Sequence, residues 1–378
     1  MQRLLVVRNP WSRARKWARN VNLWYVGVRV TKRLGASQLA SLMISRGLQA
    51  QPQRAELHLE AGRLYLKNGQ LEQAAWHWQH INPAVDGENF VEWLERTCVE
   101  DNGAILGNRL DALSALGNWY FQSGRFHKAI DCFNRVVGGG RFDPVVLNNK
   151  GLCLLRLGRD EEALSQFQQA AAIKMIPEIL VNTGLTLNRL QRYKEALICY
   201  ERAQRRGYSS QELTVNKGYA LFHLGRYDEA VLCFEMAKIV SPRDFVILNN
   251  LAACYQKVGR YDAAAETYSI ALKCFPHDGA LHNNYALCLE RQQRHAEALD
   301  HYDRALELDT DNGAFLANKA QCLARLGRYG EALAICDRLL QNSPETRFYW
   351  GLKADILTAA GAGEEAVEYY NRSLGLTG

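Results

Sequence analysis

Apolar and small residues recur along this chain at helical spacing, and one alanine marks how often the pattern returns. From Ala129 onward that alanine recurs every 33 or 34 residues. Each interval holds a pair of amphipathic stretches, and in residues 211–244 Gly225 stands between them. Such a period is typical of units that cannot bury their apolar face alone and stack on their neighbours, so it predicts a solenoid of helical hairpins. The marker residues are Ala40, Ala74, Ala129, Ala163, Ala196, Ala230, Ala264, Ala298, Ala332 and Ala366.

Several positions of the unit have a physical reason when the recurring alanine is numbered 20. In residues 211–244, Gly218 stands at position 8 and lets the second helix come close. Gly225 at position 15 supplies the left-handed residue that ends a helix. Phe234 at position 24 fills space toward the next unit, and Pro242 at position 32 stops the second helix.

This pattern resembles the tetratricopeptide repeat, whose signature has small residues at positions 8 and 20, an aromatic residue at 24 and proline at 32. The match is clean over residues 144–346 and extends with more drift to 110 and 378. The resemblance implies an all-α protein, a right-handed α-solenoid of about 9–10 helix-turn-helix units with a basic N-terminal extension.

The spacing also predicts how the chain is divided. The step from Ala74 to Ala129 is 55 residues, so the register slips between them. We expect a basic extension over 1–20, a degenerate capping repeat plus one repeat over 21–88, an inserted helix and turn over 89–109, and eight repeats over 110–378.

Asparagine occupies position 6 in six consecutive repeats. A carboxamide both donates and accepts hydrogen bonds, and in proteins that this chain resembles such a row grips the main chain of an extended peptide in the concave groove. Asparagine is also common at this position in the repeat family, so the alternative interpretation is that the row reflects the family consensus and not peptide binding. The row is Asn149, Asn182, Asn216, Asn250, Asn284 and Asn318.

A second row lies on the same helical face, because position 13 follows position 6 by seven residues. It is cationic apart from one histidine and would favour an acidic peptide segment or a free carboxylate. The alternative is that cations simply stabilise the C-terminal end of a helix. The row is Arg156, Arg189, His223, Lys257, Arg291 and Arg325.

Positive charge is concentrated at the N-terminus. Residues 1–54 contain eleven Lys or Arg and no Asp or Glu, so the formal charge of +6 is entirely N-terminal. An amphipathic helix with these charges and tryptophans suits an anionic membrane surface, an acidic protein partner or a solvated tail, with nucleic acid the least favoured partner. The candidate contacts are Arg13, Arg15, Lys16, Trp17, Arg19 and Trp24.

No motif points to catalysis, and we expect neither an enzyme nor a cofactor. The ten cysteines follow repeat positions, as small buried residues do. His77 and His80 lack an evident third metal ligand, and His282, His295 and His301 fall at unrelated repeat positions, so no metal is expected. The sequence therefore predicts a cytoplasmic scaffold, or a peripheral one at the inner face of a membrane, that binds another protein and could also self-associate.

Overall fold

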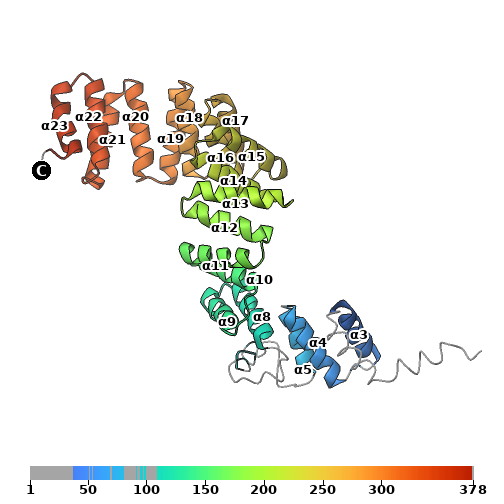
Figure 1. Ribbon diagram of the computed structural model, residues 1–378. Coiled ribbons are helices and arrows are strands. Elements are labelled where there is room, and N and C mark those ends of the chain that lie inside the picture. Colours follow the sequence, from blue (N-terminus) through green and yellow to red (C-terminus); the bar gives the residue numbers. More distant parts are fainter. Residues whose placement is uncertain are drawn as a thin grey trace, which may run out of the picture. The chain divides into compact units, whose positions relative to one another are not determined.

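The computed structural model describes residues 37–50, 52, 54–68, 70–80, 91, 94–96, 98 and 109–376. Every regular element in these ranges is an α-helix (Figure 1). The expected all-α solenoid is therefore confirmed. None of the helices in these ranges combines the length and hydropathy that a membrane span requires.

The chain divides into two compact units, residues 1–186 and 187–378. Among the described residues, the first unit starts with α3 (Ser37–Ala50), α4 (Ala55–Lys67) and α5 (Leu71–Gln79). Helix α12 crosses the division. From residue 109 onward first and second helices of hairpins alternate. The first helices are α8 (Arg109–Gln122), α10 (Pro144–Arg156), α12 (Pro177–Arg189), α14 (Gln211–His223), α16 (Phe245–Lys257), α18 (Gly279–Arg291), α20 (Gly313–Arg325) and α22 (Arg347–Ala359). The second helices are α9 (Phe126–Gly138), α11 (Asp160–Ile173), α13 (Tyr193–Arg205), α15 (Tyr227–Val240), α17 (Tyr261–Cys274), α19 (His295–Leu308), α21 (Tyr329–Asn342) and α23 (Gly363–Leu374).

The turn inside each hairpin depends on a left-handed residue at position 15. Gly225 has φ +74° and closes α14, as glycines do at the same position of most repeats. Two repeats use glutamine instead: Gln191 has φ 60° and Gln293 has φ 64°. Both glutamines accept a conformation that side chains other than glycine rarely adopt, so the hairpin geometry is kept where the glycine is missing.

Position 8 is small because the aromatic ring of position 24 lies directly on it. A Cβ atom added to Gly151 would be 2.6 Å from the ring of Phe167, and one added to Gly218 would be 3.0 Å from that of Phe234. Both rings are fully buried. The ring therefore joins the two helices of its own repeat, and its burial accounts for the recurring pair of positions.

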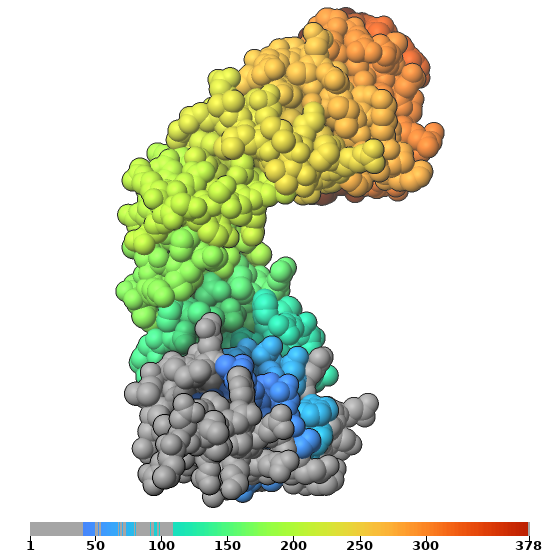
Figure 2. All heavy atoms as spheres, turned by 90° about the vertical axis from the view of Figure 1, so that its right-hand side faces the viewer, coloured from blue at the N-terminus to red at the C-terminus, as the bar shows by residue number. Residues whose placement is uncertain are grey.

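Within residues 187–378 each hairpin packs on the next, and the buried clusters run continuously from Leu197 to Ile356. First helices of neighbouring repeats also touch one another, α14 on α16, α16 on α18, α18 on α20 and α20 on α22. In the space-filling view the colours of residues 220–320 follow one another in sequence order (Figure 2). The first helices thus form one row, on which position 6 recurs.

Five of the second helices from α9 to α23 begin with an ion pair in place of a side-chain cap. Arg226 precedes α15, and its Nε and Nη2 atoms donate to the two carboxylate oxygens of Glu229 at 2.6 and 2.7 Å. Four further repeats contain the same pair. Because these pairs are exposed, each contributes little stability, and the glutamates have the structural role that their place at a helix start indicates.

Candidate functional site

All six asparagines of position 6 lie on first helices and are partly buried. In the first unit, Asn149 Nδ2 donates to Asn118 Oδ1 at 2.8 Å, and Asn182 Nδ2 donates to Asn148 Oδ1 at 2.8 Å. These amides connect consecutive first helices. Part of the row is therefore used for packing between repeats.

The second unit contains both kinds of asparagine. Asn284 Nδ2 donates to Asn249 Oδ1 at 3.2 Å, and Asn318 Nδ2 donates to Asn283 Oδ1 at 2.9 Å. Asn216 and Asn250 form no side-chain hydrogen bond within the described part of the chain. Both amides thus keep their donor and acceptor capacity.

The residue at position 5 of the preceding repeat separates the two kinds. For the bonded asparagines this residue is also an asparagine. Asn249 supplies the acceptor oxygen for Asn284, and Asn283 supplies it for Asn318. For the two asparagines without a side-chain hydrogen bond among the described residues, this residue is valine. Val215 is at position 5 of the repeat before Asn250, and Val181 is at position 5 of the repeat before Asn216. Because valine has no acceptor on its side chain, an asparagine that follows it stays available to a ligand.

The six residues of position 13 are exposed, and each is the last residue of its helix. This place satisfies the favourable interaction of a cation with the C-terminal end of a helix, so it agrees with the structural interpretation of the row. Arg325 is in an ion pair with Glu290. In the described ranges Arg156, Lys257 and Arg291 form no ion pair, and their charges remain available to a partner as well.

His223 differs from the other members of this row. Its ring stacks on Tyr193, with centroids 4.6 Å apart and planes 7° apart, and lies 4.4 Å from the ring of Tyr219. Although the residue as a whole is exposed, partial desolvation of its ring lowers the pKa of His223 from its ordinary value of 6.5. At pH 7 this residue is a neutral part of an aromatic surface beside Asn216, so the row carries no charge here.

Two histidine pairs in the described part of the chain occupy the same positions of two different repeats; His58, His77 and His282 are buried and His301 is partly buried. Nδ1 of His58 lies 2.9 Å from Nδ1 of His77, and Nδ1 of His282 lies 2.9 Å from Nδ1 of His301. Each pair joins position 4 to position 23. The expectation that His282 and His301 are unrelated is therefore wrong, and the shared separation of 19 residues was the signal that could have revealed the pairs.

The hydrogen bonds of each pair assign its protons. Nε2 of His58 lies 2.7 Å from the carbonyl oxygen of Pro52, and Nε2 of His282 lies 3.2 Å from that of Pro276. A carbonyl only accepts, so Nε2 carries the proton and Nδ1 accepts from the second histidine. Burial and the neighbouring histidines lower the pKa of His77 to about 4. His77 is thus neutral near pH 7 and has a structural role in its pair.

The outer face of α15 has a different character. Four apolar side chains are exposed there. Their exposed fractions are 60% for Leu232, 62% for Met236, 83% for Ile239 and 68% for Val240. Their spacing places them along one side of the helix. Large exposed apolar patches mark surfaces that contact other proteins, so this strip is a second candidate surface of the unit.

The N-terminal candidate contacts Arg13, Arg15, Lys16, Trp17, Arg19 and Trp24 lie outside the described residues, as does most of 89–109. The membrane or acidic-partner contact and the inserted helix therefore remain predictions from sequence. The same holds for the boundaries of the four expected segments.

Comparison with known proteins agrees with this architecture. One model of the tetratricopeptide repeat matches residues 114–175, 182–243 and 252–313, and a second model of the repeat matches residues 289–356. A comparison with curated proteins finds no match.

Solved structures share the fold at low identity. A tetratricopeptide repeat protein from Parabacteroides merdae is 16% identical with a TM-score of 0.52, over 62% of this chain and 93% of that one. YrrB, a TPR protein with an unusual peptide-binding site, is 19% identical with a TM-score of 0.44, over 49% and 95%. MamA MSR-1 is 25% identical with a TM-score of 0.41, over 44% and 97%. The repeated hairpins, the matching models and the likeness to the first of these structures together place this chain in the tetratricopeptide repeat family.

Proposed function

We propose that this protein is a scaffold that binds an extended segment of another protein across the first helices α14 and α16. The single observation that carries the proposal is the state of Asn216 and Asn250. Their partly buried amides have no hydrogen-bond partner in the described part of the chain, whereas equivalent amides in neighbouring repeats do. A partly exposed amide without a protein partner can hydrogen-bond to water, and a bound peptide can replace that water with a direct hydrogen bond.

The bound segment is held through its main chain. One carboxamide can donate to a peptide carbonyl and accept from the next peptide N–H. Two such amides on consecutive first helices would fix the direction and register of the segment without reading its side chains. This type of contact suits a scaffold whose partners share a conformation more than a sequence.

Neighbouring groups define the preferred side chains. Lys257 ends α16 and is exposed with no ion pair among the described residues, so it attracts an acidic residue of the segment. The stacked rings of Tyr193 and His223, with the tilted ring of Tyr219 next to them, offer an aromatic surface beside Asn216. The best ligands are therefore expected to be acidic at one end and apolar or aromatic at the other.

The test uses linear peptides selected from a phage-displayed random library on the full-length protein. The tightest peptide is labelled, and its affinity is measured by fluorescence anisotropy. We expect Asn216→Ala combined with Asn250→Ala to weaken binding about tenfold or more, because each lost hydrogen bond is worth about 0.5–1.5 kcal/mol.

Asn318→Ala is the matched control, because it removes the same side chain at the same repeat position where the amide already donates to Asn283. It should leave the affinity nearly unchanged. Circular dichroism verifies that all variants are folded. Equal affinity of the wild type and the double variant would reject this surface.

A further inference from the structure

A buried carboxylate lies at the junction of two repeats. Glu290 in the last turn of α18 is only 4% exposed. Tyr302 Oη donates to its Oε1 at 2.5 Å, and the guanidinium of Arg325 pairs with its Oε2. These two partners hold the carboxylate in one orientation between α19 and α20.

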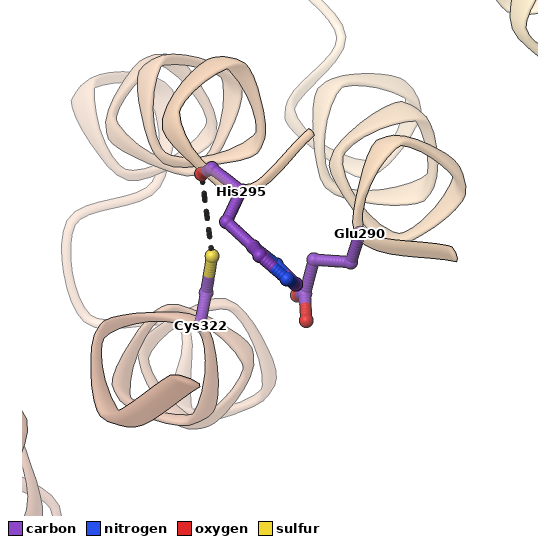
Figure 3. A group of neighbouring side chains, drawn as sticks. All are labelled: Glu290, His295 and Cys322. Carbon is purple, nitrogen blue, oxygen red and sulfur yellow. Dashed lines mark hydrogen bonds between the residues drawn. The ribbon is translucent and has the colours of Figure 1, made fainter. Parts of the chain in front are cut away.

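Two further groups that can bind a metal converge on this carboxylate. His295 begins α19, and Cys322 lies in α20 with no exposed surface. One donor atom from each of Glu290, His295 and Cys322 lies within 4.8 Å of the other two. Figure 3 shows the three side chains approaching one another from different helices.

A hydrogen bond to Gln293 leaves one ring nitrogen of His295 able to bind a metal. Nε2 of His295 lies 3.1 Å from Gln293 Oε1, which is an acceptor, so Nε2 carries the proton and Nδ1 keeps its lone pair. Nδ1 is buried and has no partner in the described part of the chain. Metal-binding histidines are typically oriented in this way, with the second ring nitrogen donating to an oxygen.

The thiol is protonated in the arrangement seen here. Cys322 Sγ donates to the main-chain oxygen of His295 at 3.5 Å, and burial raises the pKa of the thiol to about 12 (Figure 3). A bound zinc ion stabilises the thiolate strongly enough to release that proton near pH 7. Metal binding at this site would therefore release one proton to solvent for each ion bound.

The preceding junction has the same framework but lacks two of the three proposed metal ligands. There Tyr268 Oη donates to Gln256 Oε1 at 3.1 Å, and Cys288 Sγ donates to the main-chain oxygen of Tyr261 at 3.4 Å. Gln256, Tyr261 and Cys288 stand at the repeat positions of Glu290, His295 and Cys322. The cysteine is thus common to both junctions, and the carboxylate and the imidazole are the two changes that bring three ligand types together.

We propose that Glu290, His295 and Cys322 bind one Zn²⁺ between consecutive repeats. Oxygen, nitrogen and sulfur ligands at about 2.0–2.3 Å with a water molecule in the fourth position form a common zinc geometry. Rotation of the three side chains brings their donor atoms to those distances. The charges of the carboxylate and the thiolate balance the ion.

Arg325 is the competitor for the carboxylate. Its side chain is 49% exposed, so it can turn toward solvent when the metal binds. The ion then replaces the guanidinium as the positive partner of Glu290 and connects α18 and α19 to α20. Zinc would stabilise this junction because it binds the folded arrangement and not the separated repeats.

Cobalt(II) and zinc(II) titrations of the full-length reduced protein test the site. We expect one equivalent of Co²⁺ to give the near-ultraviolet thiolate charge-transfer band and the visible bands of a tetrahedral ion, and Zn²⁺ to remove both. Cys322→Ser and His295→Tyr should abolish the bands, and Glu290→Gln should weaken binding at least tenfold. Cys288→Ser is the matched control and should bind as the wild type does.

Two further measurements separate loss of the site from loss of the fold. Arg325→Gln should bind Co²⁺ several-fold more tightly than the wild type, because the competing charge is gone. Zn²⁺ should raise the melting temperature of the wild type and of Cys288→Ser but not of Cys322→Ser. Absence of the charge-transfer band in the wild type, or an unchanged band in Cys322→Ser, would overturn the proposal.

Discussion

Residues 211–274 and 279–342 are built from the same pair of hairpins but use their polar residues differently. In the first region, α14 to α17, the amides of Asn216 and Asn250 are not bonded within the described chain. In the second, α18 to α21, the amides of Asn284 and Asn318 donate to a preceding helix. There Glu290 is also enclosed by its partners.

The difference teaches that a repeat position does not have one role. The hairpin places a polar side chain at the same point of every unit, and the neighbouring repeat decides whether that side chain packs or remains available. The first region is therefore where recognition is expected, and the second is where internal polar contacts stabilise the stack.

The largest effect should come from the element that both regions share, the ring at position 24. Phe234 and Tyr302 are fully buried, so Phe234→Ala and Tyr302→Ala should each lower the free energy of unfolding by about 3–5 kcal/mol. Urea denaturation followed by circular dichroism measures this. Ile239→Ala, at an 83% exposed position, should change it by less than about 0.5 kcal/mol. A similar loss in all three variants would mean that the ring does not hold the hairpin together.

Removing only the tyrosine hydroxyl should distinguish the two regions. Tyr302 donates to a carboxylate and Tyr268 to a neutral amide. We expect Tyr302→Phe to cost about 1.5–3 kcal/mol and Tyr268→Phe about 0.5–1.5 kcal/mol, because hydrogen bonds to charged groups contribute more. Thermal and urea unfolding of the two variants give the comparison. Equal losses would indicate that the hydrogen bond to Glu290 contributes no more to stability than the hydrogen bond to Gln256 does.

Much of the fold could be predicted from the recurring residues. The period predicts paired helices, Gly225 marks a turn, and Gly218 with Phe234 marks the contact within a hairpin. These features depend on residues inside one unit, whose spacing is fixed by helix geometry. The aromatic ring at position 24 was expected to face the next unit, and the structure places it on its own first helix.

The candidate site was less predictable because it depends on contacts between units. Whether Asn250 is available follows from Val215 in the repeat before it, and whether Asn284 is bonded follows from Asn249. Both pairs can be read from the sequence once units are aligned one against the next. The burial of Glu290 cannot be predicted from the sequence in this way, because it depends on how closely two repeats pack.

Acidification should weaken the second region through its histidine pair. Burial and His282 lower the pKa of His301, while Asp300 and Glu297 oppose this in part. The unfolded chain, with an ordinary pKa of 6.5, therefore binds a proton before the folded chain does. The stability contributed by neutral His301 is present above about pH 6.5 and is lost as the pH falls toward the lowered pKa.

Replacement of both histidines tests whether they cause the loss of stability at low pH. His282→Leu with His301→Cys introduces residues found at positions 4 and 23 of other repeats, Leu248 and Cys233 among them. The melting temperature of the double variant should fall less between pH 7 and pH 5 than that of the wild type. The pair in the first unit, His58 and His77, remains in both proteins and provides a common background. An unchanged pH dependence would show that His301 is not the source of the lost stability.

The smallest effect on stability should come from the residue at position 5 of the repeat before each asparagine. Changing this residue converts the arrangement of one region into that of the other. Val215→Asn places an acceptor where Asn249 and Asn283 provide one, so the amide of Asn250 should become bonded to it. Stability should rise by at most about 0.5–1.5 kcal/mol, and affinity for the selected peptide should fall a few-fold. The reverse change, Asn249→Val, releases Asn284 and should lower stability by a similar amount. Because Val215→Asn leaves Asn216 and Asn250 themselves intact, weaker peptide binding by this variant would mean that availability of the amide, rather than its presence, determines recognition.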